Sequence, residues 1–226
     1  MAQPWKTLAT QTTDEGLLEL RQRGARDFLI TVGGLVLMNS LSNRSEVVLG
    51  QLGCQKLKNH RHPKVLVGGL GMGITLRAVL DALPADAEVV VAELNPVVVE
   101  WCRGPLAELT DGVVNDRRVQ VEVGDVADLI KRLLSDPSTR FDAVIFDLYK
   151  GPHAKTDPLA DPLYGSRAIA NVHKILRAGG MFTIWGENFD AGFDRRLKKA
   201  GFATSSQRPG RGGYRHVVFV AEKQST

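Results

Sequence analysis

A glycine-rich stretch is the most informative part of this 226-residue sequence. Gly69, Gly71 and Gly73 follow an apolar, β-branched run and precede a helical pattern. Glycine allows the backbone to turn sharply and allows a ligand to approach the peptide N–H groups. The spacing is common in turns between a strand and a helix, so it indicates a binding site only together with other residues.

Three acidic residues stand where expected strands end. Glu93 lies 22 residues after Gly71, where a carboxylate can accept hydrogen bonds from ribose hydroxyls. Asp125 and Asp147 end the next two expected strands. Because the carboxyl ends of parallel strands share one edge of a sheet, we expect all three in one crevice. The structural alternatives are a solvated strand end for Glu93 and a helix cap for Asp125, whereas Asp147 is harder to explain by structure alone.

The segment after Asp147 offers a phenol, an ammonium and an imidazole. His153 is a candidate general base, because histidine titrates near neutral pH, or else an ordinary loop residue. Tyr149 either lines an acceptor pocket or fills the core. Lys150 either holds a ligand carboxylate or is a solvated charge. Asp147, Tyr149 and His153 are therefore the candidate catalytic residues.

The elements that position these residues alternate between strand and helix. Apolar strands are expected at residues 64–67, 88–92, 118–123, 141–146 and 181–185. Such alternation predicts an α/β fold, with a mostly parallel sheet covered by helices on both faces. Residues 202–206 and 214–221 predict an antiparallel hairpin at the sheet edge.

The first part of the chain has a different pattern. Residues 17–20, 28–32 and 35–38 are strand-like, and Gly33–Gly34 predicts a two-residue hairpin turn. Residues 45–57 have helical spacing. We therefore expect an N-terminal β-hairpin region with a linking helix at residues 1–58 and a nucleoside-binding domain at 59–226.

Composition limits the function classes. With 29 Lys and Arg against 25 Asp and Glu, and 43% hydrophobic residues, the chain is not a disordered polyelectrolyte. Apolar runs are too short to span a bilayer, and no secretory signal is recognisable. We expect a cytoplasmic protein with no membrane partner. Interleaved charges make nucleic acid an unlikely partner, and the two cysteines suggest neither a disulfide framework nor a metal site.

Several motifs together resemble the spermidine synthase (polyamine aminopropyltransferase) family. They are VLVGGLGMGITLR at residues 65–77, AELNP at 92–96, the segment 116–125 and FDAVIFD at 141–147. The resemblance implies a small N-terminal β-hairpin domain before a seven-stranded, methyltransferase-like Rossmann fold of the class that binds S-adenosylmethionine. It also implies a role close to polyamine biosynthesis and a homodimer.

The resemblance also assigns ligand contacts, with S-adenosylmethionine or its decarboxylated form as the cofactor. The glycine turn (Gly69, Gly71 and Gly73) would lie beside the sulfonium tail, and Glu93 would bind the ribose. Gly124 and Asp125 would contact the adenine. Asp147 would lie over the reacting centre and also contact the cofactor.

The sequence departs from this family at three places. Met72 replaces an aspartate of the glycine loop, Lys150 replaces the second acid of the Asp-x-x-Asp motif, and Leu49–Gly50 replaces a Tyr-His pair. Each charge interaction at ~4 Å in an effective dielectric of 20 is worth about 4 kcal/mol, so Lys150 disfavours a polyamine. We expect methyl or aminopropyl transfer to a small molecule other than putrescine. The alternative is a non-catalytic nucleoside-binding or assembly module.

Overall fold

The computed structural model describes residues 3–136, 139–210 and 216–224. The chain divides into two compact units, Met1–Asn43 and Arg44–Thr226. The smaller unit is a four-stranded antiparallel sheet in the order β1-β2-β3-β4, with strands β1 Lys6–Thr13, β2 Gly16–Arg23, β3 Asp27–Val32 and β4 Leu35–Asn39. The Gly33–Gly34 turn is confirmed, since both residues have positive φ, 54° and 80°.

The larger unit contains a seven-stranded sheet in the order β10-β11-β9-β8-β5-β6-β7. Its strands are β5 Lys64–Gly68, β6 Glu88–Glu93, β7 Val119–Val123, β8 Phe141–Phe146, β9 Leu176–Gly186, β10 Phe202–Gln207 and β11 Val217–Lys223. Strand β11 is antiparallel to both of its neighbours, β9 and β10, and the other neighbouring pairs are parallel. The expected fold class and the edge hairpin are thus confirmed, although residues 214 and 215 of the expected last strand lie outside the described residues.

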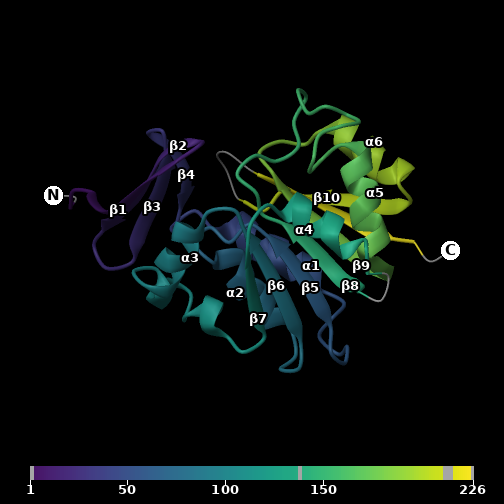
Figure 1. Ribbon diagram of the computed structural model, residues 1–226, viewed down its shortest axis with the longest axis horizontal. Coiled ribbons are helices and arrows are strands. Elements are labelled where there is room, and N and C mark those ends of the chain that lie inside the picture. The colour runs from purple at the N-terminus through teal and green to yellow at the C-terminus, as the bar shows by residue number, and fades with distance from the viewer. Residues whose placement is uncertain (1–2, 137–138, 211–215, 225–226) are drawn as a thin grey trace. The chain divides into compact units, whose positions relative to one another are not determined.

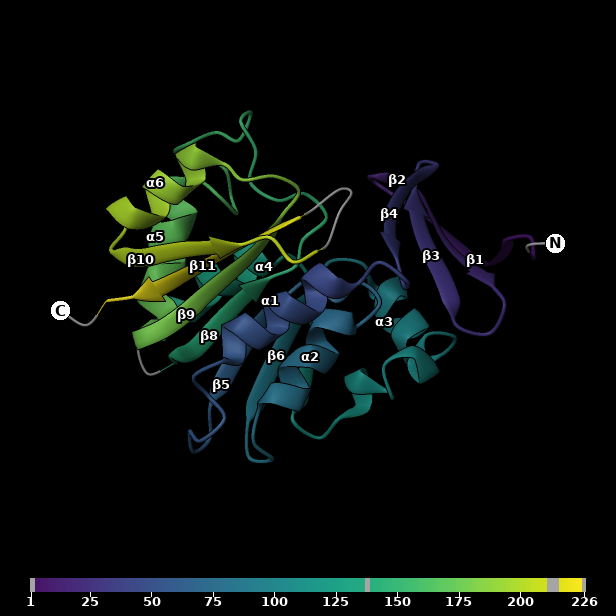
Figure 2. The ribbon, with the colours of Figure 1, turned by 180° about the vertical axis from the view of Figure 1, so that it is seen from behind.

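Helices cover both faces of this sheet. The helices α1, α2 and α3 lie on one face, and α4, α5 and α6 on the other (Figures 1 and 2). Their bounds are α1 Arg44–Cys54, α2 Ile74–Ala82, α3 Pro96–Arg103, α4 Val126–Leu133, α5 Ser166–Ile175 and α6 Ala191–Lys199, with short 3-10 turns η1 Ala107–Leu109 and η2 Val113–Asn115. Because both faces are covered, β8 is buried along its whole length, as its uninterrupted apolar sequence suggests.

The helix α1 belongs to the larger unit. The domain boundary expected from the sequence, after residue 58, places this helix in the N-terminal region instead. The physical reason for the difference is close packing against α2. A Cβ at Gly50 would come within 2.9 Å of Ala78 Cβ and of the Thr75 carbonyl oxygen. The missing side chain lets the two helices approach closely.

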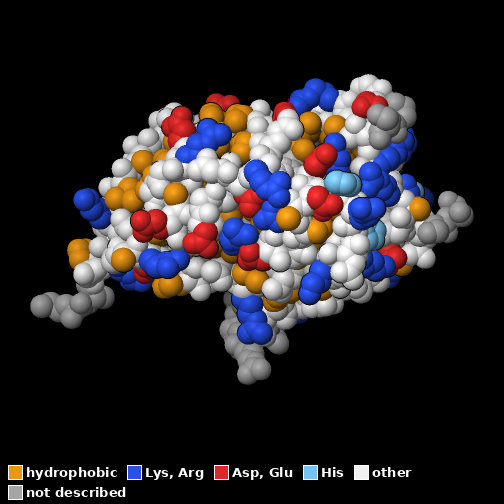
Figure 3. All heavy atoms as spheres, turned by 90° about the horizontal axis from the view of Figure 1, so that it is seen from below, with side chains coloured by type: hydrophobic (Ala, Val, Ile, Leu, Met, Phe, Trp, Pro, Cys, Tyr) orange, Lys and Arg blue, Asp and Glu red, His pale blue; other side chains and the backbone are white. Residues whose placement is uncertain are grey.

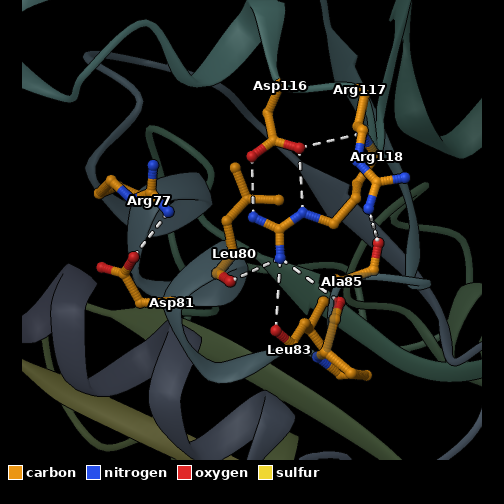
Figure 4. A network of polar contacts seen from close by, with 9 residues as sticks. Arg77, Leu80, Asp81, Leu83, Ala85, Asp116, Arg117 and Arg118 are labelled. Atoms are coloured by element: carbon orange, nitrogen blue, oxygen red, sulfur yellow. Dashed lines mark hydrogen bonds and ion pairs between the residues drawn. The ribbon is translucent and has the colours of Figure 1, made fainter.

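A polar network ties the end of α2 to the start of β7 (Figure 4). Arg118 Nη1 donates to the carbonyl oxygens of Leu80, Leu83 and Pro84 at 2.9, 3.3 and 3.4 Å. The same guanidinium donates through Nε and Nη2 to the Asp116 carboxylate at 3.0 and 2.8 Å. These bonds satisfy carbonyl groups at the C-terminus of α2 that lack helical partners. The hydrogen bond from Arg118 also lowers the pKa of Asp116 to about 2.

Charged side chains of both signs are interspersed on the face shown in Figure 3. The last turn of α6 is basic, and Lys198 in this turn pairs with Asp194 at 2.7 Å. Among the described residues, no helix is long and apolar enough to cross a membrane.

Candidate functional site

The glycine turn is pressed against the end of β8. Gly69 has φ +89°, and a Cβ at this position would collide with the carbonyl oxygen of Asp147. Its amide donates to the Ala92 carbonyl at 2.8 Å, while the Asp147 amide donates to the Gly68 carbonyl at 2.9 Å. Only glycine fits this approach, so the sequence requirement at Gly69 follows from the position of Asp147.

Glu93 is buried, with 7% of its surface exposed, and it is tied to the glycine turn. Oε2 accepts from the Leu70 amide and Oε1 from the Asn95 amide, each at 2.9 Å. Burial raises the pKa of Glu93, and the backbone amides around it oppose this shift. Each carboxylate oxygen has a further lone pair, so Glu93 can brace the turn and still accept from a ligand hydroxyl.

A cysteine that the sequence did not single out also contacts this turn. Cys102 is buried and free, and its Sγ donates to the Gly71 carbonyl at 3.3 Å. Burial, with the nearby Glu93 carboxylate as the second cause, raises the pKa of the Cys102 thiol to about 12. The side chain therefore acts as a neutral donor that helps to fix the turn.

Gly124 and Asp125 follow β7 at the same edge of the sheet. The Gly124 amide donates to the Glu93 carbonyl at 2.8 Å, and a Cβ at Gly124 would meet open space. Asp125 Oδ1 accepts from the Ala127 amide at 2.7 Å, so Asp125 caps α4. A capping carboxylate has a second oxygen, and a contact with a ligand remains compatible with this role.

Asp147 lies at the end of β8 beside the start of α2. Thr75 Oγ1 donates to its Oδ2 at 2.5 Å. The residue keeps some exposed surface, but its carboxyl group is surrounded by protein. The pKa of Asp147 is raised to about 7, first by burial and second by the nearby Glu46 carboxylate, while the hydrogen bond from Thr75 lowers it. A carboxyl group that titrates near neutral pH can exchange a proton with an acceptor.

A second group of side chains lies near Asp147. Ser45 Oγ lies 2.6 Å from Glu46 Oε2 and 3.1 Å from His216 Nδ1. Trp185 Nε1 donates to Ser45 Oγ at 3.3 Å, and the rings of Trp185 and His216 are 4.7 Å apart. These residues come from α1, from β9 and from the position before β11, so no local motif signals their meeting.

The loop after Asp147 forms one wall of a cavity. Residues 150–154 and 187–190 enclose a volume of about 570 Å³. The backbones of the two loops are in close contact at Gly151, where an added Cβ would lie only 2.6 Å from Gly186 Cα. The buried Tyr164 hydroxyl donates to the Lys150 carbonyl at 2.7 Å and anchors the same loop. Lys150 and His153 thus share this cavity with Glu187.

The three loop residues proposed from the sequence differ in their surroundings. Lys150 Nζ lies 5.2 Å from the centre of the Tyr149 ring. His153 Nδ1 accepts from the Lys155 amide at 3.2 Å, so the neutral ring carries its proton on Nε2 and acts as a donor. This geometry favours Asp147 over His153 as the proton acceptor. No group of three metal-ligating side chains occurs in the described ranges.

The sheet order, the glycine turn and the acidic edge together define a methyltransferase-like Rossmann protein. The chain belongs to the spermine/spermidine synthase domain family, whose model matches residues 46–191. This finding confirms the resemblance stated from the sequence.

Individual relatives agree with this assignment. A polyamine aminopropyltransferase of Clostridium tetani is 31% identical over 129 residues, which are 56% of this chain and 42% of the relative. An eEF1A lysine and N-terminal methyltransferase of Danio rerio is 37% identical over 138 residues, which are 60% of this chain and 19% of the relative. The chain thus spans less than half the length of either relative.

A solved structure supports the fold. The spermidine synthase of Thermotoga maritima superposes with a TM-score of 0.75 at 20% identity, over 96% of this chain and 73% of the other. The N-terminal antiparallel sheet and the seven-stranded sheet are therefore features of a known architecture.

Proposed function

We propose that this protein transfers an alkyl group from a sulfonium nucleoside, S-adenosylmethionine or its decarboxylated form, to a small-molecule acceptor. The observation that carries the proposal is the contact between the glycine turn and Asp147, next to the buried Glu93. Glu93 would accept from the ribose hydroxyls, and Gly124 with Asp125 would contact the adenine. The sulfonium group would then lie beside the glycine turn, with Asp147 over the reacting carbon.

The reaction follows from this arrangement. The lone pair of the acceptor attacks the carbon bound to the sulfonium sulfur, the carbon–sulfur bond breaks, and its electrons remain on sulfur as a neutral thioether. The acceptor proton passes to Asp147. Because the sulfonium is already a good leaving group, the protein contributes mainly alignment of the two reactants. The cavity between residues 150–154 and 187–190 is our candidate for the far end of the acceptor, with Tyr149 and His153 as neighbouring polar groups.

Three observations bear on which group is transferred. The aminopropyltransferase named among the relatives favours aminopropyl transfer. The methyltransferase relative favours methyl transfer, as does Met72, which is buried with 2% exposure where the family has an acid. Met72 offers no charge to the ammonium of a transferred aminopropyl group.

The products distinguish these alternatives. The wild-type protein and Asp147→Asn are incubated with each sulfonium compound and a panel of amines and alcohols. Release of methylthioadenosine indicates aminopropyl transfer, and release of S-adenosylhomocysteine indicates methyl transfer. We expect one of these products from the wild-type protein and at least ~100-fold less from Asp147→Asn, as for loss of an acid–base group. Nucleoside binding without product across the panel would contradict transfer and favour a binding or assembly module.

The assembly and location of the protein remain proposals. We propose a homodimer in the cytoplasm, supported by the family assignment alone. Light scattering that returns the mass of one chain would reject the dimer.

A further inference from the structure

The first turn of α1 approaches Asp147 through one shared hydroxyl group. Thr75 Oγ1 lies 2.5 Å from Asp147 Oδ2 and 3.4 Å from the carbonyl oxygen of Glu46. The backbone of Glu46 is therefore separated from the Asp147 carboxyl only by the Thr75 hydroxyl. This contact places a second acidic residue, Glu46, beside the end of β8. The second acid of the family's Asp-x-x-Asp motif is replaced here by Lys150.

The Glu46 carboxylate accepts a hydrogen bond from Ser45, which has further polar contacts. A serine hydroxyl has one proton, and the shortest contact of Ser45 Oγ is with Glu46 Oε2, at 2.6 Å. Ser45 therefore donates to Glu46 and accepts from Trp185 Nε1 and His216 Nδ1. This pattern requires the proton of neutral His216 on Nδ1. Two donors, one from β9 and one from the position before β11, thus orient Ser45, and Ser45 orients Glu46.

We propose that Glu46 is a positioning residue that acts through Asp147 and keeps it able to exchange a proton near neutral pH. Two neighbouring carboxylates resist simultaneous ionisation, because each negative charge disfavours the other. The inference rests on the proposed role of Asp147 as proton acceptor. It adds a residue from α1 that neither the sequence pattern nor the family motif indicates.

Other groups around Asp147 have different effects. Tyr164, from the segment before α5, is buried and its pKa is raised, so it adds no charge. Lys150 and Tyr149 belong to the loop of Asp147 itself, and His216 reaches the network through Ser45. Burial is the largest cause of the raised pKa of Asp147. Removing the Glu46 charge should therefore lower this pKa only in part.

The direct test is a carboxyl titration followed by ¹³C NMR, with Asp147→Asn used to assign the Asp147 signal. In Glu46→Gln we expect the pKa of Asp147 to fall by ~1 unit, a tenfold change in its protonation equilibrium. Trp185→Phe keeps an aromatic ring but removes the donor to Ser45, and it should shift the same signal in the same direction by less. Glu100→Gln, on the exposed face of α3, is the matched control and should leave the titration unchanged.

An unchanged Asp147 titration in Glu46→Gln would overturn the inference, as would an equal shift in Glu100→Gln. If Glu46→Gln does not fold, an unchanged titration in Trp185→Phe would overturn it instead. In the pH profile of the transfer rate, the acidic limb should move to lower pH in Glu46→Gln. A purely structural role of Glu46 would not produce this shift. The titration requires no turnover, so it tests the role of Glu46 separately from the proposed function. The proposed function is contradicted by a different result, the failure of both sulfonium compounds to bind.

Discussion

The hydrogen bond between Thr75 and Asp147 provides a quantitative test of the site. Thr75 is buried, with 1% exposure, and its hydroxyl donates to Asp147 Oδ2 at 2.5 Å. This bond stabilises the charged form of the carboxyl group and therefore lowers its pKa. Thr75→Val keeps the shape of the side chain but removes the donor.

The expected magnitude follows from the strength of a hydrogen bond to a charged group. Such a bond contributes about 1.5–3 kcal/mol, and 1.36 kcal/mol corresponds to one pKa unit. Starting from the value of about 7, Thr75→Val should raise the pKa of Asp147 by ~1–2 units. The deprotonated fraction at about pH 7 should fall by roughly fivefold to fiftyfold and recover at higher pH.

The assay is the pH profile of the transfer rate, or the ¹³C titration of the Asp147 carboxyl. Thr75→Ser retains the hydroxyl and is the matched control, in which the acidic limb should stay close to that of the wild-type protein. A profile for Thr75→Val that is unchanged, or that moves to lower pH, would refute the assignment of Thr75 as donor to the charged form of Asp147.

Two further predictions concern stability. Arg118→Met should destabilise the protein by about 2–4 kcal/mol in urea unfolding, because it leaves several carbonyl groups at the end of α2 without a donor; a loss below about 0.5 kcal/mol would contradict the role drawn in Figure 4. Asp147→Asn should stabilise the protein by about 1–3 kcal/mol near pH 8 and have little effect near pH 4. The reason is that the pKa of Asp147 is higher in the folded than in the unfolded protein. The wild-type protein therefore loses stability as the pH rises from the unfolded-state pKa to the folded-state pKa. Equal effects at the two pH values would contradict the raised pKa of Asp147.

The sequence predicted the acidic edge of the sheet because its cause is local. Glu93 and Asp147 each follow an apolar run, and Asp125 follows the alternating strand VQVEV and Gly124. Parallel strands bring the carboxyl ends together. The glycine turn was predictable for the same reason. The cap that Asp125 forms on α4 was one of the alternatives stated from the sequence and is confirmed. What could not be predicted was that Glu93 accepts from the backbone amide of Leu70 in the glycine turn.

The network around Glu46 could not be predicted, because its members are distant in the sequence. Ser45 and His216 are 171 positions apart and meet only because β11 inserts beside β9 in the sheet. The strand β1 was missed for another reason. Its sequence KTLATQTT is mostly polar and largely exposed, so it lacks the apolar alternation by which strands are recognised.

The boundary at residue 58 differs from the structure because the position of α1 depends on Gly50. A glycine inside a helix gives no local sign of the partner that it approaches. Only the contact with α2 shows that this helix belongs to the larger unit.

The central claim, that Glu93 holds the sugar of a sulfonium nucleoside, can be tested by calorimetric titration with S-adenosylmethionine and its decarboxylated form. We expect at least one of them to bind with one site per chain. Glu93→Gln should weaken binding by roughly tenfold or more, since a lost hydrogen bond to a charged group is worth about 1.5–3 kcal/mol. Glu100→Gln should bind as the wild-type protein does. Failure of both compounds to bind the wild-type protein, or equal affinity in Glu93→Gln, would contradict the claim.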